Sequence, residues 1–451
     1  MPHKIKIHKG LNIPLKGKAE KILNQGQHQS SLFALKPTDF PNLTPKSSLK
    51  EGDKVKAGEV VFFDKNKPEL KFTSPVSGTL KSIVRGERRK ILEFVIESNN
   101  SQEYVQFNPG NLSGLSREQV KELLQNSGIW PYLRQRPFNI IANASDTPKA
   151  IFISGFDSSP IAPDYDYILN GQETDFQKGI DALAKLTEGK IHVTVNGQFP
   201  ISKFWTSIKG IELNTISGPH PAGNIGTQIH HIDPLNKGEV IWHINPQDLL
   251  IIGRLFNKGV YDATKIIAIA GSEVLKPSYY KIIAGTSIDA ILKDNVTPGS
   301  NRFISGNPLT GTEIGKNDFL GFYHHQISVI PDGNHYEFLG WALPGLDKFS
   351  FSRSYFSWLM PTKEFKIDTN IKGGKRALMI TGNFEKVFPM DIYPMQLLKA
   401  MIIEDIDLME KLGIYEVVEE DFALCEFIDT SKTDMQTIVR KSLDLIVKEM
   451  N

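Results

Sequence analysis

The feature that most constrains the fold is a glycine-punctuated stretch of short apolar runs at residues 50–84, KEGDKVKAGEVVFFDKNKPELKFTSPVSGTLKSIV. Gly52, Gly58 and Gly78 lie where tight turns require a positive φ angle. The apolar run VVFF at residues 60–63 is short enough to be a buried strand between two such turns. The stretch therefore predicts two short β-hairpin halves, each bounded by glycine.

This pattern resembles the barrel-sandwich fold of biotinyl and lipoyl carrier domains, in which a lysine at a hairpin tip carries the prosthetic group. The tip here is DKNKP at residues 64–68, so Lys65 and Lys67 are the candidates for modification. The Met-Lys-Met sequence of biotin carriers is absent, and the lipoyl pattern is matched only at Asp64-Lys65. We therefore interpret both lysines as solvated turn residues, and a free-standing carrier that uses Lys65 is the most distant alternative.

Length and charge exclude several classes of protein. A chain of 451 residues predicts about three domains or more. Its 52 Lys and Arg residues balance 51 Asp and Glu residues, and its longest basic cluster is RGERRK at residues 85–90, so nucleic-acid binding is not expected. Apolar runs such as residues 266–270 fall far short of the roughly 18 residues that span a bilayer. No transmembrane segment is predicted, and any membrane role must come through partner proteins.

A single cysteine limits the redox and metal chemistry of the chain. Cys425 alone excludes an intramolecular disulfide, an iron–sulfur cluster with the usual four thiolate ligands and a multi-cysteine zinc site. We interpret Cys425, in the sequence FALC, as a buried small apolar side chain in a protein of a reducing compartment.

Beyond residue 100 the pattern changes to alternating strands and helices. Ser116 and Thr174 each begin a capping-box pattern, and Asn245-Pro246 is a further helix start. Strand, helix and strand follow one another within about 45 residues from Ala150, which is typical of a parallel sheet.

The later part of the chain predicts two further units. Strands at residues 265–270, 279–284 and 301–305 favour a β-grasp unit, and apolar stripes at residues 395–410 and 434–449 favour helices. The fold class is therefore multidomain α/β and α+β, with a barrel-sandwich unit in residues 1–100, a Rossmann-like domain in 101–258, a β-grasp (SLBB-like) unit in 259–335 and a mainly helical region in 336–451.

Three glycines form a candidate nucleotide-type loop. Gly218, Gly223 and Gly226 follow a predicted strand, where phosphate-binding loops lie in α/β domains. Their spacing, G-x4-G-x2-G, departs from the dinucleotide fingerprint. A degenerate nucleotide loop and a structural turn therefore both stay open.

Arg134, Arg136 and Phe138 are the candidate quinone-binding residues. A planar, carbonyl-bearing ligand could stack on the aromatic ring while a guanidinium donates a hydrogen bond to its oxygen. The same residue types are enriched at polar protein interfaces, and we favour that alternative.

Two pairs of adjacent histidines are the nearest approach to a set of metal ligands. His230-His231 and His324-His325 are expected on strands, where neighbouring side chains point to opposite faces. One histidine of each pair should therefore point inward and the other outward, and no metal site is predicted.

Several segments together carry a resemblance that covers the whole chain. They are KGLNIP at 9–14, KFTSPVSGT at 71–79, RGERR at 85–89, GPHPAGNIG at 218–226, RFISGNPLTG at 302–311, FLGWALPG at 338–345, residues 390–398 and EEDFALC at 419–425. In these parts and their order the chain resembles the A-type subunit of the sodium-translocating NADH:quinone reductase. That family is similar in architecture to the cluster-bearing subunit of the Rnf complex and the flavin-bearing subunit of complex I. A second cysteine that the family places four residues after the first is Asp429 here.

The resemblance implies a peripheral subunit on the cytoplasmic side of a bacterial inner membrane, bound to other subunits that include membrane-embedded ones. The whole complex oxidises NADH, reduces ubiquinone or menaquinone and exports Na+. The missing cysteines and the altered glycine loop favour a docking subunit that is inactive alone and binds no redox cofactor tightly, with flavins and iron–sulfur centres on other subunits. The alternative is a subunit that itself binds quinone through Arg134, Arg136 and Phe138.

Overall fold

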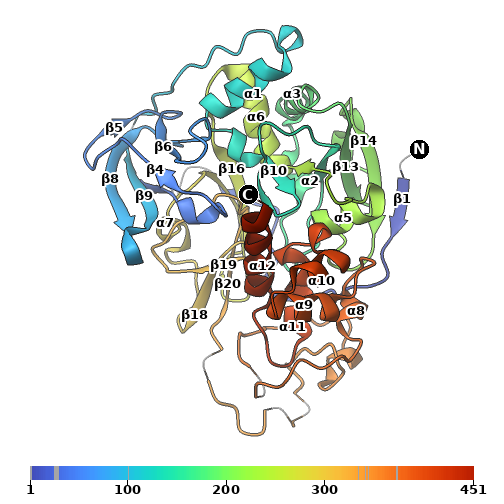
Figure 1. The fold of residues 1–451 in the computed structure, drawn as a ribbon. Helices are drawn as coiled ribbons and strands as arrows, with labels where there is room; N and C mark the ends of the chain where they lie inside the picture. The colour runs from blue at the N-terminus through green and yellow to red at the C-terminus, as the bar shows by residue number, and fades with distance from the viewer. Residues whose placement is uncertain are drawn as a thin grey trace.

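The computed structural model describes residues 3–24, 30–99, 101–333, 335–340, 342–343, 345–371 and 374–450. Within these residues four β-sheets are arranged around a shared hydrophobic core, and a group of helices forms the C-terminal end (Figure 1).

Two small sheets form the predicted barrel-sandwich unit. They comprise β3 (Leu32–Leu35), β9 (Ile91–Ser98), β8 (Gly78–Arg85) and β5 (Lys54–Val55) in one sheet, and β4 (Pro45–Lys46), β6 (Val60–Asp64) and β7 (Lys71–Thr73) in the other. The rings of Phe62 and Phe94 stack between the sheets with centroids 5.0 Å apart, and Phe62 stacks on Phe72 at 4.4 Å. Aromatic stacking of this kind fixes how two sheets face each other.

The turn glycines of this unit serve two different purposes. Gly52 and Gly58 have φ angles of +95° and +90°, as the turn pattern predicts. The expectation of a positive φ was wrong for Gly78, which lies at the start of β8. A β-carbon there would overlap the carbonyl oxygen of Glu97, so glycine is required by close approach of the neighbouring strand.

A seven-stranded sheet forms the α/β domain. Its order is β1 (His3–Lys6), β14 (Glu212–Ser217), β13 (Lys190–Asn196), β12 (Ala150–Ser154), β15 (Ile241–His243), β10 (Arg134–Arg136) and β11 (Ile140–Ile141). The first five strands run parallel, and β10 and β11 are antiparallel additions. Reading from β14 to β15, the sequence order of the parallel strands is 3-2-1-4, the order of a doubly wound sheet. The expected Rossmann-like sheet is confirmed.

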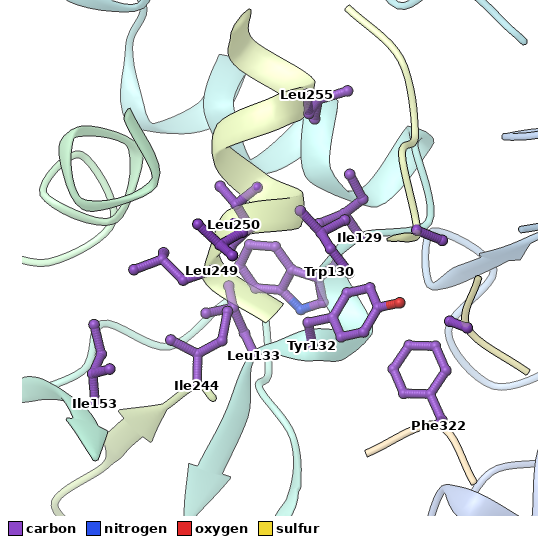
Figure 2. Close-up of a cluster of buried hydrophobic side chains, with 14 of the residues drawn as sticks. Ile129, Trp130, Tyr132, Leu133, Ile153, Ile244, Leu249, Leu250, Leu255 and Phe322 are labelled. Carbon is purple, nitrogen blue, oxygen red and sulfur yellow. The ribbon is translucent and has the colours of Figure 1, made fainter. Parts of the chain in front are cut away.

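Helices cover this sheet. They are α1 (Arg117–Asn126), α2 (Tyr165–Leu169), α3 (Glu173–Leu183), α4 (Lys203–Ser207), α5 (Ile225–Ile232) and α6 (Pro246–Lys258). Figure 2 shows Trp130, Tyr132 and Leu133 packed beneath Leu249 and Leu250 of α6.

The helix starts test the capping patterns. Ser116 forms the predicted capping box with Gln119, and Asn245 caps α6 through a bond from the Gln247 amide. The Thr174 prediction was wrong: α3 begins one residue earlier, at Glu173. Thr174 therefore lies inside the first turn, where its side chain cannot act as the cap.

A six-stranded sheet forms the β-grasp unit. Its order is β19 (Thr312–Ile314), β18 (Asn301–Ser305), β20 (Gln326–Pro331), β16 (Thr264–Ala270), β17 (Ser278–Ile283) and β2 (Leu23–Asn24), with the short helix α7 (Asp289–Leu292). Phe322, in the loop before β20, stacks on Tyr132 of the α/β domain at 4.4 Å and meets Phe40 of the barrel-sandwich unit edge-on at 4.9 Å. One side chain therefore contacts all three units.

The C-terminal region has its own core and is helical from Phe384 onward. The prediction of a mainly helical region over residues 336–451 was wrong for its first part, since the only helical element of the described residues between 335 and 383 is one short 3-10 turn, η5 (Phe356–Leu359). The region contains α8 (Phe384–Val387), α9 (Pro394–Ile402), α10 (Ile406–Lys411), α11 (Ala423–Ile428) and α12 (Met435–Met450). The expectation of one helix over residues 395–410 was wrong. The chain breaks at Glu404, which has a φ angle of +57°, and Asp405 caps the separate helix α10.

Residues 3–24 form a strap across the molecule. β1 pairs with β14 at the edge of the α/β sheet (Figure 1). β2 pairs with β17 of the β-grasp sheet. Between β1 and β2, Leu15 forms a bridge with Phe365 of the C-terminal region. Residues 3–24 were predicted to belong to the unit of residues 1–100, yet their strands pair with other parts of the chain. The boundaries of the four predicted domains stay a prediction.

No helix in the described part of the chain is long and apolar enough to cross a membrane.

Candidate functional site: a cavity at the sheet switch point

A cavity of about 180 Å³ lies at the carboxyl ends of β12 and β15. Ser154 at the end of β12 and His243 at the end of β15 line it, together with Gly223 and Asn224 of the glycine loop. At this point the strand order reverses, since β13 and β14 lie on one side of β12 and β15 on the other. Ligands of doubly wound sheets bind at such switch points, so this is the candidate site.

The glycine loop connects β14 to α5, and the chain itself fills the space beside each glycine. A β-carbon on Gly218, whose φ is +148°, would meet the carbonyl oxygen of Ile7 at 2.5 Å. A β-carbon on Gly223 would meet the amide of Ser158 at 2.6 Å, and one on Gly226 would meet Asp421 Oδ1 at 2.5 Å. The glycines therefore admit three other segments of the same protein.

Arg134 is the predicted quinone-binding residue that reaches the cavity. It lies on β10, and its guanidinium lies 4.5 Å from the centroid of the Tyr323 ring, which also lines the cavity. Within the described residues, no carboxylate forms an ion pair with it. A half-buried guanidinium beside an aromatic ring can bind a carbonyl or carboxylate oxygen.

Arg136 is committed to the C-terminal region. Its side chain is 1% exposed, and it forms ion pairs of 2.7 Å with Glu420 and 3.1 Å with Asp421. Burial raises the pKa of the Asp421 carboxyl, and the positive charge of Arg136 opposes that shift. Arg136 therefore joins β10 to the acidic helix η7 (Glu419–Phe422).

Phe138 belongs to the same internal contact. Its ring is buried and meets Tyr415 edge-on at 5.9 Å, inside the C-terminal core. Its backbone has a φ of +76°, which is rare for a bulky residue, and Arg440 donates a 2.8 Å hydrogen bond to its carbonyl oxygen. The structure therefore does not bring Arg134, Arg136 and Phe138 together around one ligand.

His220 is a cavity residue that the sequence reasoning missed. The Gly223 amide donates to Ser158 Oγ at 2.8 Å, and that hydroxyl lies 3.0 Å from His220 Nδ1. Burial lowers the pKa of His220 to about 4, so the ring is neutral at pH 7. If the Ser158 hydroxyl donates its proton to Nδ1, the ring proton is on Nε2, a buried atom without a partner among the described residues. The signal was present, since His220 lies between two glycines of the loop.

The histidine pairs are arranged differently from the expectation. His230 and His231 lie in the last turn of α5, so their assignment to a strand was wrong. His230 pairs with Glu416 at 3.1 Å and accepts a bond from the Asp391 amide. His325 is buried and His324 is half-buried, and both lie just before β20. No group of three or more His, Cys, Asp or Glu side chains in the described part of the chain is arranged to hold a metal ion.

The structure also shows where the remaining candidate residues lie. Lys65 and Lys67 are exposed in the turn between β6 and β7. Cys425 is fully buried in α11, as expected, and burial raises the pKa of its thiol well above the usual value. In the segment at 338–345, Trp341 and Pro344 lie outside the described residues.

Known families cover most of the chain. Residues 5–99 match the family described as the NqrA N-terminal barrel-sandwich hybrid domain, residues 115–261 the NqrA second alpha/beta domain, and residues 266–316 the NQRA C-terminal domain. The A-type subunit (NqrA) of the Na(+)-translocating NADH-quinone reductase of Neisseria meningitidis serogroup A strain Z2491 is 39% identical over 448 residues, which is 99% of this chain and 100% of that protein. The chain belongs to the NqrA family. The protein of the same name from Pasteurella multocida is 36% identical, again over 99% of this chain and 100% of that one.

The resemblance and the fold class inferred from the sequence are thereby confirmed. Membership of the NqrA family also means that the chain has partner subunits. Among solved structures, an NAD+-reducing [NiFe]-hydrogenase matches 75% of this chain and 62% of its own at a TM-score of 0.37 and 10% identity, a likeness too weak to carry an argument.

Proposed function

We propose that the chain is the peripheral, docking subunit of a Na+-translocating NADH:quinone reductase, held on the cytoplasmic side of the inner membrane by membrane-embedded subunits. The observation that carries the proposal is the full-length similarity, at 36–39% identity, to proteins of that name. NADH oxidation, quinone reduction and Na+ export are then activities of the assembled complex, and the flavins and iron–sulfur centres belong to other subunits.

A concentration of exposed apolar side chains supports the docking role. Among the described residues, fifteen of the twenty exposed large apolar side chains lie between residues 336 and 408, a stretch we call the apolar region. Tyr336, Phe338 and Trp358 are 107%, 87% and 51% exposed. Aromatic residues are enriched in the cores of protein interfaces. In Figure 1 the start of this region projects from the lower part of the molecule.

The occupant of the apolar region is proposed to be a membrane-embedded subunit of the same complex. The described part of this chain supplies no membrane-spanning helix, whereas proteins of this family are named as subunits of a Na+-translocating enzyme. The ion path then lies on other subunits, and a peripheral subunit must bury surface against them to stay attached.

The geometry of the switch point supports the absence of a tightly bound redox cofactor at this site. The cavity is smaller than the roughly 300 Å³ at which ligand pockets usually begin. The glycine loop is packed against residues of the same chain at all three glycines. Quinone binding by this chain stays a prediction, since Arg134 lines the cavity while Arg136 and Phe138 serve internal contacts.

The test is a triple substitution of the apolar region, Tyr336→Ser, Phe338→Ser and Trp358→Ser, in the complete complex. We expect the chain to leave the membrane fraction and NADH:quinone reductase activity to fall in parallel, while its melting temperature is unchanged. Phe199→Ser, at a residue 67% exposed on the α/β domain, is the matched control and should leave assembly intact. Retention of the triple variant in the complex would contradict the docking surface, and a yellow, flavin-bearing isolated chain would contradict the cofactor assignment.

A further inference from the structure

The hairpin that joins β8 to β9 ends in a basic tip, which we define as the side chains of Arg85, Arg88, Arg89 and Lys90. All four are exposed, and Glu87 is the one carboxylate within residues 85–90. The turn is closed by two backbone bonds, from the Gly86 amide to the Lys90 carbonyl oxygen at 2.8 Å and from the Lys90 amide to the Glu87 carbonyl oxygen at 3.1 Å. Four positive charges are therefore held together at the end of one hairpin.

The cations of the basic tip have no carboxylate partner within the described residues. Lys81, earlier on β8, shows the contrast, because it pairs with Glu97 at 2.9 Å. The polar contact that the tip makes is internal, since Arg85 Nη1 donates to the carbonyl oxygen of Arg89 at 3.3 Å. The charge of the tip is therefore available to groups outside the chain.

The backbone of the tip is strained where two of its charges lie. Arg88 and Arg89 have φ angles of +53° and +61°, in the left-handed region that side chains other than those of Asn and Asp rarely adopt. Hairpin turns that require such angles usually contain Asn-Gly or Asp-Gly. Strained residues that break a local rule in this way cluster at functional sites. The two arginines are unfavourable for the turn itself, so their presence needs a reason beyond the turn.

We propose that the basic tip binds the phosphate groups of anionic lipids at the membrane surface. Arginine matches phosphate through two parallel N–H donors, and clusters of four or more Lys and Arg side chains bind anionic lipid surfaces. The inference rests on the proposed function, which places the chain beside the membrane, and it adds a second contact to the one made by the apolar region.

Two observations favour a membrane over an acidic protein as the partner. The tip lacks the apolar centre of a protein interface, since Val84, at 38% exposed, is the one large apolar side chain exposed on β8 and β9. The start of β8 pairs with β5, and the opposite end of the hairpin lies toward the lower part of the molecule in Figure 1, where the apolar region projects. The basic tip and the proposed contact with membrane-embedded subunits therefore face the same way.

The test is co-sedimentation of the full-length chain with vesicles of phosphatidylcholine, prepared with and without phosphatidylglycerol. We expect the natural chain to bind the anionic vesicles about tenfold or more tighter than the neutral ones, and this preference should shrink as salt is added. The variant Arg88→Asn with Arg89→Gly places residues suited to a left-handed turn at both positions. Its melting temperature should equal or exceed that of the natural chain, while its affinity for anionic vesicles should fall about tenfold or more.

A matched control separates the tip from the net charge of the chain. Lys203→Gln with Lys209→Gln removes two exposed cations from the α/β domain, so it changes the net charge by the same amount and should leave vesicle binding unchanged. An equal fall in this control would overturn the proposal. Equal affinity of the natural chain and the tip variant would also overturn it, as would equal binding of the natural chain to neutral and anionic vesicles.

Assembly of the complete complex separates this inference from the proposed function. The tip variant keeps the apolar region and should assemble, whereas the triple variant at Tyr336, Phe338 and Trp358 should not. A tip variant that fails to assemble, with a natural chain that ignores anionic vesicles, would identify an acidic protein as the partner and overturn the lipid proposal. A triple variant that assembles would contradict the proposed docking surface and leave the vesicle result standing.

Discussion

Lys265 Nζ lies 2.7 Å from Asp248 Oδ1, and neither side chain is more than 2% exposed. The pair joins α6 of the α/β domain to β16 of the β-grasp sheet, and His325 lies 3.6 Å from the other oxygen of Asp248. Burial alone would raise the pKa of Asp248, but the charges of Lys265 and His325 outweigh it and hold the pKa below its usual value. The two domains are therefore connected through a charged contact inside their common core.

Removal of one partner of this pair should be costly. Lys265→Met leaves Asp248 buried without its main counter-charge, so we expect a loss of about 3–5 kcal/mol in the free energy of unfolding. Lys258→Met removes a lysine that is 52% exposed and pairs with Asp262, and it should cost about 0–1 kcal/mol. Urea denaturation gives the free energy of unfolding of each variant. Equal losses in the two variants would contradict the assignment of Lys265 and Asp248 as a buried ion pair.

His220 should make the fold sensitive to mild acid. Its pKa is about 4 in the fold against 6.5 when unfolded, so the unfolded chain binds the extra proton between these values. The contribution of the neutral ring is complete above about pH 6.5 and is lost as the pH falls toward 4, by up to about 3 kcal/mol. His220→Asn should reduce the number of protons taken up on unfolding in this pH range by about one. The melting temperature should then fall less steeply as the pH is lowered. The exposed His8→Asn is the control, and a profile unchanged by His220→Asn would exclude this role.

Gly226→Ala tests the contact between α5 and the acidic segment. The added methyl group would meet Asp421 Oδ1 at 2.5 Å, and we expect a cost of about 1–3 kcal/mol because the segment must move. Gly114→Ala, where no atom lies within 4 Å of the new methyl group, should change stability by no more than about 0.5 kcal/mol. Thermal unfolding gives both values, and a neutral Gly226→Ala would show that Asp421 is not held there.

Phe138 should behave as a core residue. Its side chain is 8% exposed within the C-terminal core, so Phe138→Ala is expected to cost about 3–5 kcal/mol. The exposed Phe199→Ala should cost far less. Titration of both chains with a short-chain quinone tests the alternative. A stable Phe138→Ala chain with a lower affinity for the quinone would restore the quinone-binding hypothesis for this segment.

Local sequence patterns predicted the elements well where the cause is local. The capping box at Ser116, the Asn245-Pro246 start of α6 and the turn glycines Gly52 and Gly58 depend on residues a few positions apart. Thr174 shows the limit of this approach, since α3 begins at Glu173 and does not use the available cap.

The candidate site could be predicted only in part, because its contacts join distant segments. The glycine loop was found at the correct end of a strand, but nothing near Arg136 in the sequence shows that its partners are Glu420 and Asp421, almost three hundred positions later. The order of strands at the switch point is likewise a property of the whole sheet. Residue type identified the arginines as candidate binding groups, and long-range packing decided which groups they contact.

The strap at residues 3–24 has a consequence for biosynthesis. These residues are translated before the segments they pair with, so β1 must wait for β14 at residues 212–217, and Leu15 must wait for Phe365. At roughly 5–20 residues per second, translation takes tens of seconds to supply these partners. An unpaired strand is a template for wrong association during that interval. The strap is thus made well before its partners, and it is secured only after both β14 and the segment around Phe365 have been translated.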